Sequence, residues 1–347
     1  MFFIFNIVLL LFLFHENVYS YQSKMTFKTF INIKKLEFSD YSDILDVLNN
    51  IKISSLHISK LLSYSHIEKL NGYFEKDNIN TVNIHQEKQK KIDILSNGIL
   101  KNNIEAQRMV NVIFSDEGNE CVFHLRSKNK IIVVYDPLDG SENIDINMPT
   151  GTIFGCYKDN LNFNNTLNSI NAQHNLVCGG YVLYSSSINL VFFFQNQLYH
   201  FEYDDLMKDF ICVNDNLKMP IKGNIYSVNE GKIYNFHKKH KLYLDKIKKE
   251  NYNLRYSGCL VADLHSILLK GGLYMCPKDV NTNQSKINLL YKGKPISKII
   301  HYAGGICVDE YRNIEFKKIE NYHQTIPYYF GSRENMQDFI TFCQKIF

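Results

Sequence analysis

The chain has 347 residues, with 39 Lys and Arg against 35 Asp and Glu and a net charge of +4. This length suits two packed domains, and a content of 45% apolar and 21% charged residues excludes a disordered chain. A positive surplus this small argues against a dedicated nucleic-acid-binding protein, in which the positive charge is larger and clustered.

The N-terminal segment has the pattern of a secretory leader. Residues 2–14 are apolar apart from Asn6, a run too short to cross a bilayer, and compact residues follow at 18–20, where a signal peptidase cleaves. We predict a signal peptide over residues 1–20, the alternative being a buried N-terminal strand or helix. Residues 21–36 are basic without an acidic residue, so we expect a leader extension over 21–37. The protein would then enter the secretory pathway and reach a plastid-like organelle; the alternative is the cytoplasm.

The first half of the chain alternates between helical and β-rich patterns. The apolar spacing of residues 39–62, opened by Ser and Asp capping candidates, predicts a helix. Residues 71–91 are polar and aperiodic, which predicts a long surface loop of the kind that is usually functional. A helix is expected over 92–112. Strands are expected at 121–125, 130–135, 150–157, 177–184, 190–195, 197–203 and 210–213.

The second half alternates more regularly between strands and helices. Strands are expected at 224–228 and 272–276, and a charged helix contains Asp245. Further helices are expected at 259–269, 294–303 and 334–347. This order predicts an α/β protein. The eight cysteines form no C-x-x-C pair and lie mostly in apolar runs, which indicates buried free thiols rather than disulfides or a zinc site.

The segment 130–157 carries the clearest chemistry. Asp136 ends a β-rich run, and Asp139 follows it after a Pro-Leu turn. Two carboxylates on a rigid turn can face one cavity and hold divalent cations, because hard cations such as Mg²⁺ prefer oxygen ligands. Gly140 and Ser141 come next, and glycine lets backbone N–H groups approach an anion closely. D-x-x-D-G alone would be an ordinary turn, but D-P-L-D-G-S-x-N-I-D followed by G-T-I-F is far more specific.

This string resembles the class 1 fructose-1,6-bisphosphatase family, part of the wider group of lithium-sensitive sugar and inositol phosphatases. The resemblance covers roughly residues 38–346. It implies a layered α/β/α/β/α sandwich of two domains, a metal-binding domain over 38–215 and a sugar-phosphate domain over 216–347, with the site at their interface. Further matching blocks lie in the family's order at 87–97, 115–117, 180–184, 225–231, 254–258, 289–291 and 303–305.

The resemblance also implies the reaction, which is Mg²⁺-dependent removal of the C1 phosphate from fructose 1,6-bisphosphate. Two or more Mg²⁺ ions, which Mn²⁺ could replace, would be held by Asp116, Glu117, Asp136, Asp139, the carbonyl of Leu138, and Glu87 on a mobile loop. Asp93 and Glu117 would orient and deprotonate the attacking water, and Asp139 completes the catalytic set. The sugar and its phosphates would contact Gly140, Ser141, Glu142, Asn229, Lys232, Arg255, Tyr256 and Lys286. In the family the arginine comes from a neighbouring subunit, which implies a homo-oligomer, a tetramer or a dimer. No nucleic acid and no stable membrane span are expected.

Considered singly, most of these residues have ordinary structural interpretations. Glu87 lies in a charged run typical of a solvated surface, and Asp93 could cap a helix. Arg255 and Lys286 could be surface charges. Only the pair Asp136 and Asp139 stands out without the resemblance.

The chain departs from the family pattern at several positions. Lys292 stands where the family has a glutamate metal ligand, so either one metal is lost with Lys292 partly in its place, or Lys292 turns to solvent. Lys232 and Cys276 each replace a tyrosine, and Lys232 could bind phosphate as a point charge. Asp116 is one methylene shorter than the usual glutamate, and Glu142 replaces a serine. These changes predict a slow enzyme.

The family's AMP site is incomplete in this sequence. Lys130 is retained, but the adjacent tyrosine is Ile131 and the later arginine is Lys158. We expect AMP inhibition to be weak or absent.

Three other functions stay open. A sedoheptulose-1,7-bisphosphatase is the nearest enzymatic alternative, although Asn229-Glu230-Gly231 favours fructose. An inositol phosphatase is disfavoured, because its C-terminal W-D motif needs a tryptophan and the chain has none. The alternative from another class is a catalytically silent relative that binds a sugar phosphate, and Lys292 is its main support.

Overall fold

The structure is a computed structural model that describes residues 24–73, 89–106, 110–118, 122–123, 131–158, 166–172, 175–310 and 312–346. The predicted signal peptide, most of the predicted loop at 71–91 with Glu87, and Lys130 lie outside these ranges. Among the helices of the described ranges, none combines the length and the apolar character that spanning a membrane requires.

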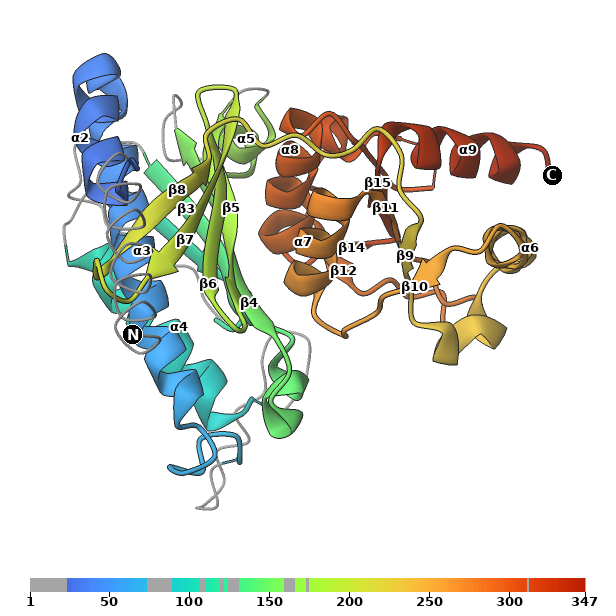
Figure 1. Cartoon of the computed structure of the whole chain (residues 1–347), viewed down its shortest axis with the longest axis horizontal. Coiled ribbons are helices and arrows are strands. Elements are labelled where there is room, and N and C mark those ends of the chain that lie inside the picture. Colours follow the sequence, from blue (N-terminus) through green and yellow to red (C-terminus); the bar gives the residue numbers. More distant parts are fainter. Residues whose placement is uncertain are drawn as a thin grey trace, which may run out of the picture.

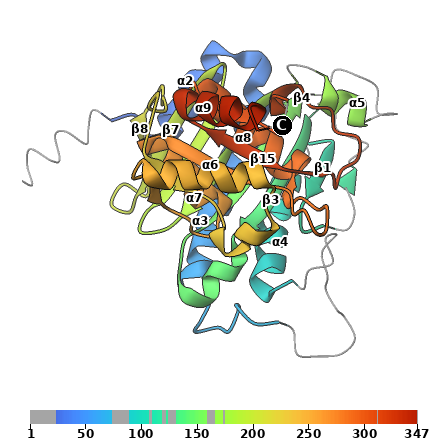
Figure 2. The ribbon, with the colours of Figure 1, turned by 90° about the vertical axis from the view of Figure 1, so that its right-hand side faces the viewer.

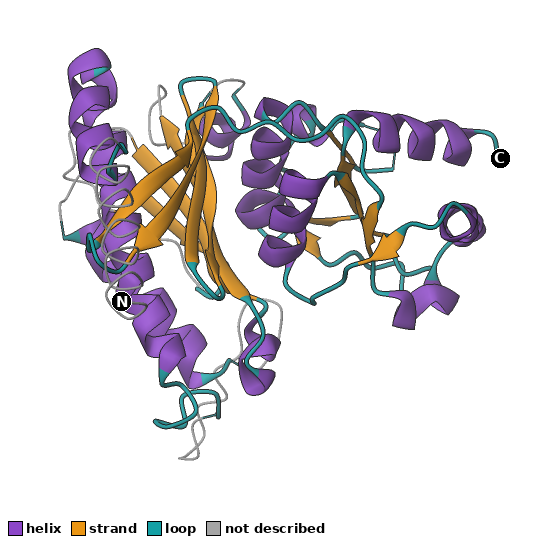
Figure 3. Ribbon diagram, in the orientation of Figure 1, coloured by secondary structure: helices purple, strands orange, loops and turns teal. Residues whose placement is uncertain are grey.

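The elements form a layered α/β/α/β/α sandwich, which confirms the expected fold class (Figure 1). One helical layer covers the outer face of a large sheet, a second layer lies between the two sheets, and a third covers the far face of the smaller sheet (Figure 3). In Figure 2, α6 and α9 of the third layer lie nearest the viewer. The helices are α2 (Phe27–Glu37), α3 (Ser42–Ser63) and α4 (Lys91–Glu105) in the first layer, α7 (Leu260–Lys270) and α8 (Lys294–Tyr302) in the second, and α6 (Lys238–Lys249) and α9 (Arg333–Gln344) in the third.

The large sheet has eight strands in the order β2-β1-β3-β4-β5-β6-β7-β8. β1 and β3 run parallel, and the other neighbours run antiparallel. β3 is buried along its whole length, because helices cover both faces of the sheet and its sequence is a continuous apolar run. The strands are β1 (Val112–Ser115), β2 (Val122–Phe123), β3 (Ile131–Asp139), β4 (Thr150–Lys158), β5 (Leu176–Tyr184), β6 (Ile188–Phe194), β7 (Gln197–Asp204) and β8 (Asp209–Asn214).

The smaller sheet has five strands in the order β10-β9-β11-β15-β13, and β12 pairs separately with β14. Its strands are β9 (Ile225–Ser227), β10 (Asn253–Leu254), β11 (Gly272–Cys276), β13 (Ile306–Val308) and β15 (Tyr328–Gly331), and the separate pair is β12 (Ile287–Asn288) and β14 (Thr325–Ile326). Short helical segments complete the fold: η1 (Ser39–Tyr41), η2 (Ser141–Ile146), α5 (Thr166–Asn171), η3 (Glu230–Asn235), η4 (Leu289–Gly293) and η5 (Ile314–Phe316).

Three apolar cores correspond to the spaces between the layers. The first lies between α2, α3, α4 and the large sheet, and the second lies between that sheet and α7 and α8. The third lies between the smaller sheet and α6 and α9. Alternate residues of each large-sheet strand point into different cores, so both faces of the sheet contribute to stability.

Helix α2 corrects the expectation of a leader extension over 21–37. Phe27 and Phe30 are fully buried and pack edge-on against Phe192 and Phe201 of the large sheet. Aromatic side chains of this size contribute strongly to a core, so α2 belongs to the folded protein.

Other element boundaries differ less. The helix expected over 92–112 ends at Glu105, because the β-branched run that follows pairs with β3 as β1. Strands β1, β10, β12, β13, β14 and β15 were not predicted. The seven cysteines in the described ranges are free thiols, as expected, and Cys121 lies outside them.

We predict acid-sensitive stability from His240 in α6. The residue is 1% exposed, and its ring contacts the Tyr329 hydroxyl at 3.2 Å and stacks on Phe339. Burial, with Lys239 and His237 adding to it, lowers the pKa of His240 to about 3. Because the unfolded chain has the ordinary pKa of about 6.5, it binds more protons than the folded state between these values, and stability falls as the pH falls through this window.

This group alone should make the free energy of unfolding about 2 kcal/mol lower at pH 5 than at pH 7.5. Urea unfolding at the two pH values checks this: the difference in unfolding free energy between them should be smaller in His240→Phe than in the wild-type protein, by that amount. The exposed His57 provides the control, because His57→Phe should keep the wild-type difference. Equal pH dependence in both variants would contradict the assignment.

Candidate active site

Three aspartates converge on one lysine at the edge of the large sheet. Asp116 directly follows β1, and Asp136 and Asp139 end β3, which runs parallel to β1 in a register that brings these ends together. The Nζ atom of Lys292, in η4, lies 2.9 Å from Asp136 Oδ2, 3.3 Å from Asp139 Oδ1 and 3.7 Å from Asp116 Oδ2. Lys292 therefore points into the acidic cluster, which decides between the two orientations considered from the sequence.

Burial and mutual repulsion set the electrostatics of this cluster. Burial raises the pKa of Asp136 to about 8, with Lys292 opposing the rise and Asp116 and Asp139 adding to it. For Lys292, burial alone would lower the pKa, but the three carboxylates together raise it well above its ordinary value. The lysine is therefore a charged ammonium group at neutral pH.

Asp139 is held from both sides. Its Oδ2 atom accepts hydrogen bonds from the Val261 N–H at 3.0 Å and the Cys259 thiol at 3.2 Å, while its Oδ1 atom faces Lys292. Val261 lies in the first turn of α7, where backbone N–H groups have no partner within the helix. Leu138, expected to contribute its carbonyl, is buried, and its N–H donates to Asp136 Oδ1 at 3.2 Å. The support from α7 was not predicted, because a backbone donor leaves no sequence signal.

A pair of acidic residues, Asp93 and Glu117, lies beside the cluster of three aspartates. Asp93 is in the first turn of α4 and accepts a hydrogen bond from the Lys90 N–H at 2.9 Å. Burial raises the pKa of Asp93 to about 7, and the negative charge of Glu117 adds to this shift. Gln89, directly after the undescribed segment 74–88, donates to Glu117 Oε2 at 2.6 Å and to its carbonyl at 2.9 Å. The Asp93 carboxyl group therefore gains or loses its proton near neutral pH.

The turn after β3 requires glycine at position 140. Gly140 has a φ of 76°, and a Cβ atom there would lie 2.7 Å from Cys259 Cβ. Ser141 begins η2, and its carbonyl accepts a hydrogen bond from Lys90 Nζ at 3.2 Å. The Glu142 side chain is 87% exposed and lies 4.0 Å from Lys90 Nζ, so it points away from the acidic cluster.

Basic and polar side chains from the C-terminal half of the chain lie near this cluster. Contact with Lys286 lowers the pKa of Lys232, which shows that the two ammonium groups face each other. The charges of Lys286, Lys232 and Lys292 all lower the pKa of the Cys276 thiol against the rise caused by burial, so all three lysines lie near this thiol.

Tyr256 connects these groups. It is 43% exposed, its hydroxyl interacts with Asn229, and it is affected by the charge of Asp139. Arg255 precedes it; its N–H donates to the Tyr226 carbonyl at 2.9 Å, and the residue is exposed. The structure therefore brings expected residues of both halves near one another, whereas Glu87 is not described, Glu142 points to solvent, and no contact joins the Arg255 side chain to the described cluster.

The donor chemistry of this site suits a hard divalent cation, because the converging groups are carboxylates. In the described ranges, however, no three acidic, histidine or cysteine side chains surround a common metal position. The three aspartates surround Lys292 instead. Lys292 therefore occupies the position among the three aspartates that a divalent ion shared by them would take.

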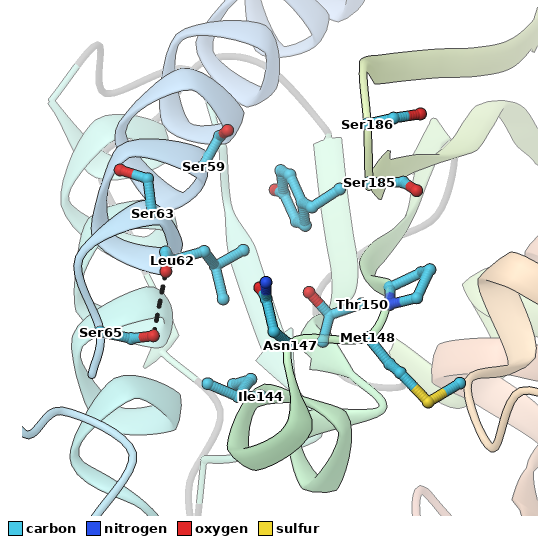
Figure 4. A pocket seen from close by; sticks show the side chains of 12 residues that line it. Ser59, Leu62, Ser63, Ser65, Ile144, Asn147, Met148, Thr150, Ser185 and Ser186 are labelled. Atoms are coloured by element: carbon cyan, nitrogen blue, oxygen red, sulfur yellow. Dashed lines mark hydrogen bonds between the residues drawn. The ribbon is translucent and has the colours of Figure 1, made fainter.

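A separate pocket of about 350 Å³ lies between the end of α3 and the start of β4 (Figure 4). Tyr184 in its wall shares a 2.8 Å hydrogen bond with Thr152, which donates to the Pro137 carbonyl at 2.8 Å. No charged side chain lines it, so it offers nothing to neutralise a phosphate and is not the candidate site. Its lining residues are Ser59, Leu62, Ser63, Ser65, Ile144, Asn147, Met148, Pro149, Thr150, Tyr184, Ser185 and Ser186.

We predict that Gly140→Ala destabilises the protein, because alanine is strained at this φ and its methyl group would overlap Cys259. The free energy of unfolding should fall by about 2 kcal/mol or more in urea denaturation. Gly98, in α4, is the matched control, since nothing lies within 4 Å of a Cβ atom placed there. Gly98→Ala should leave stability unchanged or raise it by up to about 1 kcal/mol. Equal stability of the two variants would contradict the prediction.

Comparison with known proteins gives a consistent result. Residues 25–215 match the family profile described as fructose-1-6-bisphosphatase, N-terminal domain, and residues 219–344 match that of the C-terminal domain. The chain is 33% identical over 320 residues to a chloroplastic fructose-1,6-bisphosphatase of Pisum sativum, covering 85% of this chain and 77% of the relative. It is 34% identical over 266 residues to a class 1 enzyme of Persephonella marina, covering 75% and 81%.

A solved structure agrees with these relatives. The holo form of Leishmania major fructose-1,6-bisphosphatase superimposes with a TM-score of 0.85 at 29% sequence identity. The match covers 93% of this chain and 99% of that one.

Proposed function

The chain belongs to the class 1 fructose-1,6-bisphosphatase family, and we propose that it hydrolyses the C1 phosphate of fructose 1,6-bisphosphate to give fructose 6-phosphate and phosphate. The observation that carries the proposal is the placement of opposite charges around one position. Asp116, Asp136 and Asp139 surround Lys292, and Lys232 and Lys286 lie close together near Cys276, which Lys292 also affects. A molecule with two phosphates needs both groups, one for reaction and one for binding.

The reacting phosphate would bind at the acidic side with a divalent ion, which we propose to be Mg²⁺. Asp116, Glu117, Asp136, Asp139 and the Leu138 carbonyl would hold the ion, with Glu87 joining them, and the ion would polarise the phosphate oxygens. The Gly140–Ser141 backbone N–H groups would hold the phosphate being removed.

Asp93 would accept a proton from the attacking water, with Glu117 beside it. Its pKa of about 7 suits this role, because a base is most effective when its pKa lies near the working pH. Glu117 both raises this pKa and keeps the carboxylate basic. The proton therefore has an acceptor that belongs to the protein itself.

The distal phosphate would bind between Lys232 and Lys286. Lys286 destabilises the charged form of Lys232, and a dianion bound beside both groups would remove that repulsion. Asn229 and Tyr256 would contact the sugar. Arg255 is exposed, which suits a residue that reaches a neighbouring subunit in a dimer or tetramer.

Three further features belong to this proposal. We propose that residues 1–20 direct the protein into the secretory pathway and that the chain divides into domains near residue 215. We also propose weak or absent AMP inhibition, because Lys158 is engaged with its own chain. Its Nζ atom donates to the Asp40 carbonyl at 3.3 Å and lies 4.6 Å from the Tyr41 ring.

The central experiment is phosphate release from fructose 1,6-bisphosphate and sedoheptulose 1,7-bisphosphate, with Mg²⁺ and with a strong chelator. We expect release from the fructose substrate that depends on Mg²⁺ and is abolished in Asp139→Asn, whose fold should persist. Faster release from the sedoheptulose substrate would change the substrate assignment. Turnover that survives chelation would contradict the metal requirement, and no release from either substrate would favour a silent binding protein.

Lys232 should matter for the distal phosphate only. Lys232→Met should raise the KM for fructose 1,6-bisphosphate by roughly tenfold, since a charge-assisted contact contributes about 1.5–3 kcal/mol. It should change the KM for fructose 1-phosphate little, because that molecule has no second phosphate. The exposed Lys249 at the end of α6 is the matched control, and Lys249→Met should leave both values unchanged. An equal effect on both substrates would contradict the assignment of Lys232 to the distal phosphate.

A further inference from the structure

We infer that the Lys292 ammonium group is a resident cation that takes the place of one divalent ion, so that the catalytic cluster holds a single divalent ion beside it. This inference rests on the proposed function, because it concerns the same site. It specifies how the charge of the acidic cluster is balanced in this chain.

The first support is the position of the ammonium group. Its three closest carboxylate oxygens belong to three different aspartates at 2.9, 3.3 and 3.7 Å. The aspartate side chains are 2–7% exposed, and that of Lys292 is 20% exposed. A cation placed centrally among buried carboxylates fills the position that a shared metal ion would need.

The second support is the rigidity of the segment that carries Lys292. The fully buried Asn288 caps η4, and its Oδ1 atom accepts hydrogen bonds from the N–H groups of Leu290 at 2.8 Å and Tyr291 at 3.1 Å. The Tyr328 hydroxyl donates to the Gly293 carbonyl at 2.8 Å. The backbone is therefore fixed on both sides of Lys292, and the side chain starts from a defined place beside the aspartates.

The third support is the charge balance. Asp116, Glu117, Asp136 and Asp139 carry four negative charges when ionised, and Lys292 cancels one of them. The lysine thus supplies positive charge that a divalent ion would otherwise have to supply. The described cluster therefore needs less divalent charge than the same carboxylates would need without Lys292, which favours one ion fewer in this chain.

An ammonium group replaces only part of what a metal ion does. It can neutralise a phosphate oxygen and donate hydrogen bonds, but it does not lower the pKa of a bound water as a Lewis acid does. Activation of the water therefore depends on the remaining ion and on Asp93. A slow enzyme is the expected consequence.

The test counts Mn²⁺ ions bound per chain, by calorimetric titration and by electron paramagnetic resonance of free Mn²⁺, without substrate. The wild-type protein should bind one ion. Lys292→Gln, which keeps a similar length without the charge, should bind two. Lys292→Arg is the matched control that keeps the charge, and it should bind one. Two or more ions on the wild-type protein, or equal counts for wild type and Lys292→Gln, would overturn the inference.

Thermal unfolding provides a readout that does not require activity. Removal of Lys292 leaves buried carboxylates without their counter-charge, so Lys292→Gln should have a lower Tm than wild type in chelator. Mn²⁺ should then raise its Tm more than that of wild type, because ligand binding stabilises the folded state. A variant that folds only with Mn²⁺ supports the inference. If Lys292→Gln folds under no condition, the number of Mn²⁺ ions bound by the wild-type protein is the test. One bound ion supports the inference, and two or more overturn it.

Phosphate release measured on the same samples separates the two proposals. Ion counts that change as expected without any release would refute the proposed function and leave the resident cation in place. Release of phosphate with unchanged ion counts would refute the resident cation alone.

Discussion

The contacts of the Asp139 carboxylate join the two halves of the molecule. One oxygen accepts from Val261 and Cys259 at the start of α7, and the other faces Lys292. This requires α7 to lie almost in contact with the large sheet. Glycine makes that approach possible, since a Cβ atom on Gly151 would lie 2.5 Å from Val261 Cβ. The position of α7, and with it the smaller sheet, therefore depends on small residues in β4 and on one carboxylate.

The same contacts explain how the protein tolerates buried charge. Three nearly buried aspartates would repel one another and lose hydration, which is costly unless each has a partner. Asp139 has the Val261 N–H and the Cys259 thiol, Asp136 has the Leu138 N–H, and Lys292 lies near all three. The stability of the structure and the charge of the candidate site thus depend on one arrangement of side chains, and a change in either affects the other.

Much of this could be predicted from the sequence. Continuous β-branched and aromatic runs identified β3 to β7, and the D-P-L-D-G-S string identified the turn that ends β3. Helix α2 was missed because basic residues such as Lys34 and Lys35 surround its apolar positions and resemble an extension. The direction of Lys292 could not be read from sequence, because it depends on η4 and on carboxylates more than 150 residues away. The same holds for the support of Asp139 by a backbone N–H of α7.

The separation of these partners along the chain has a consequence for synthesis. Lys292 follows Asp139 by 153 residues, and Val261 follows it by 122. At ribosomal rates of 5–20 residues per second, roughly 8–30 s pass between translation of the aspartate and of its lysine. During this interval the nascent first half presents an acidic edge that its own sequence does not yet neutralise. The acidic end of the large sheet therefore gains its partners only when the second half of the chain has been made. The candidate site is assembled during the last third of translation.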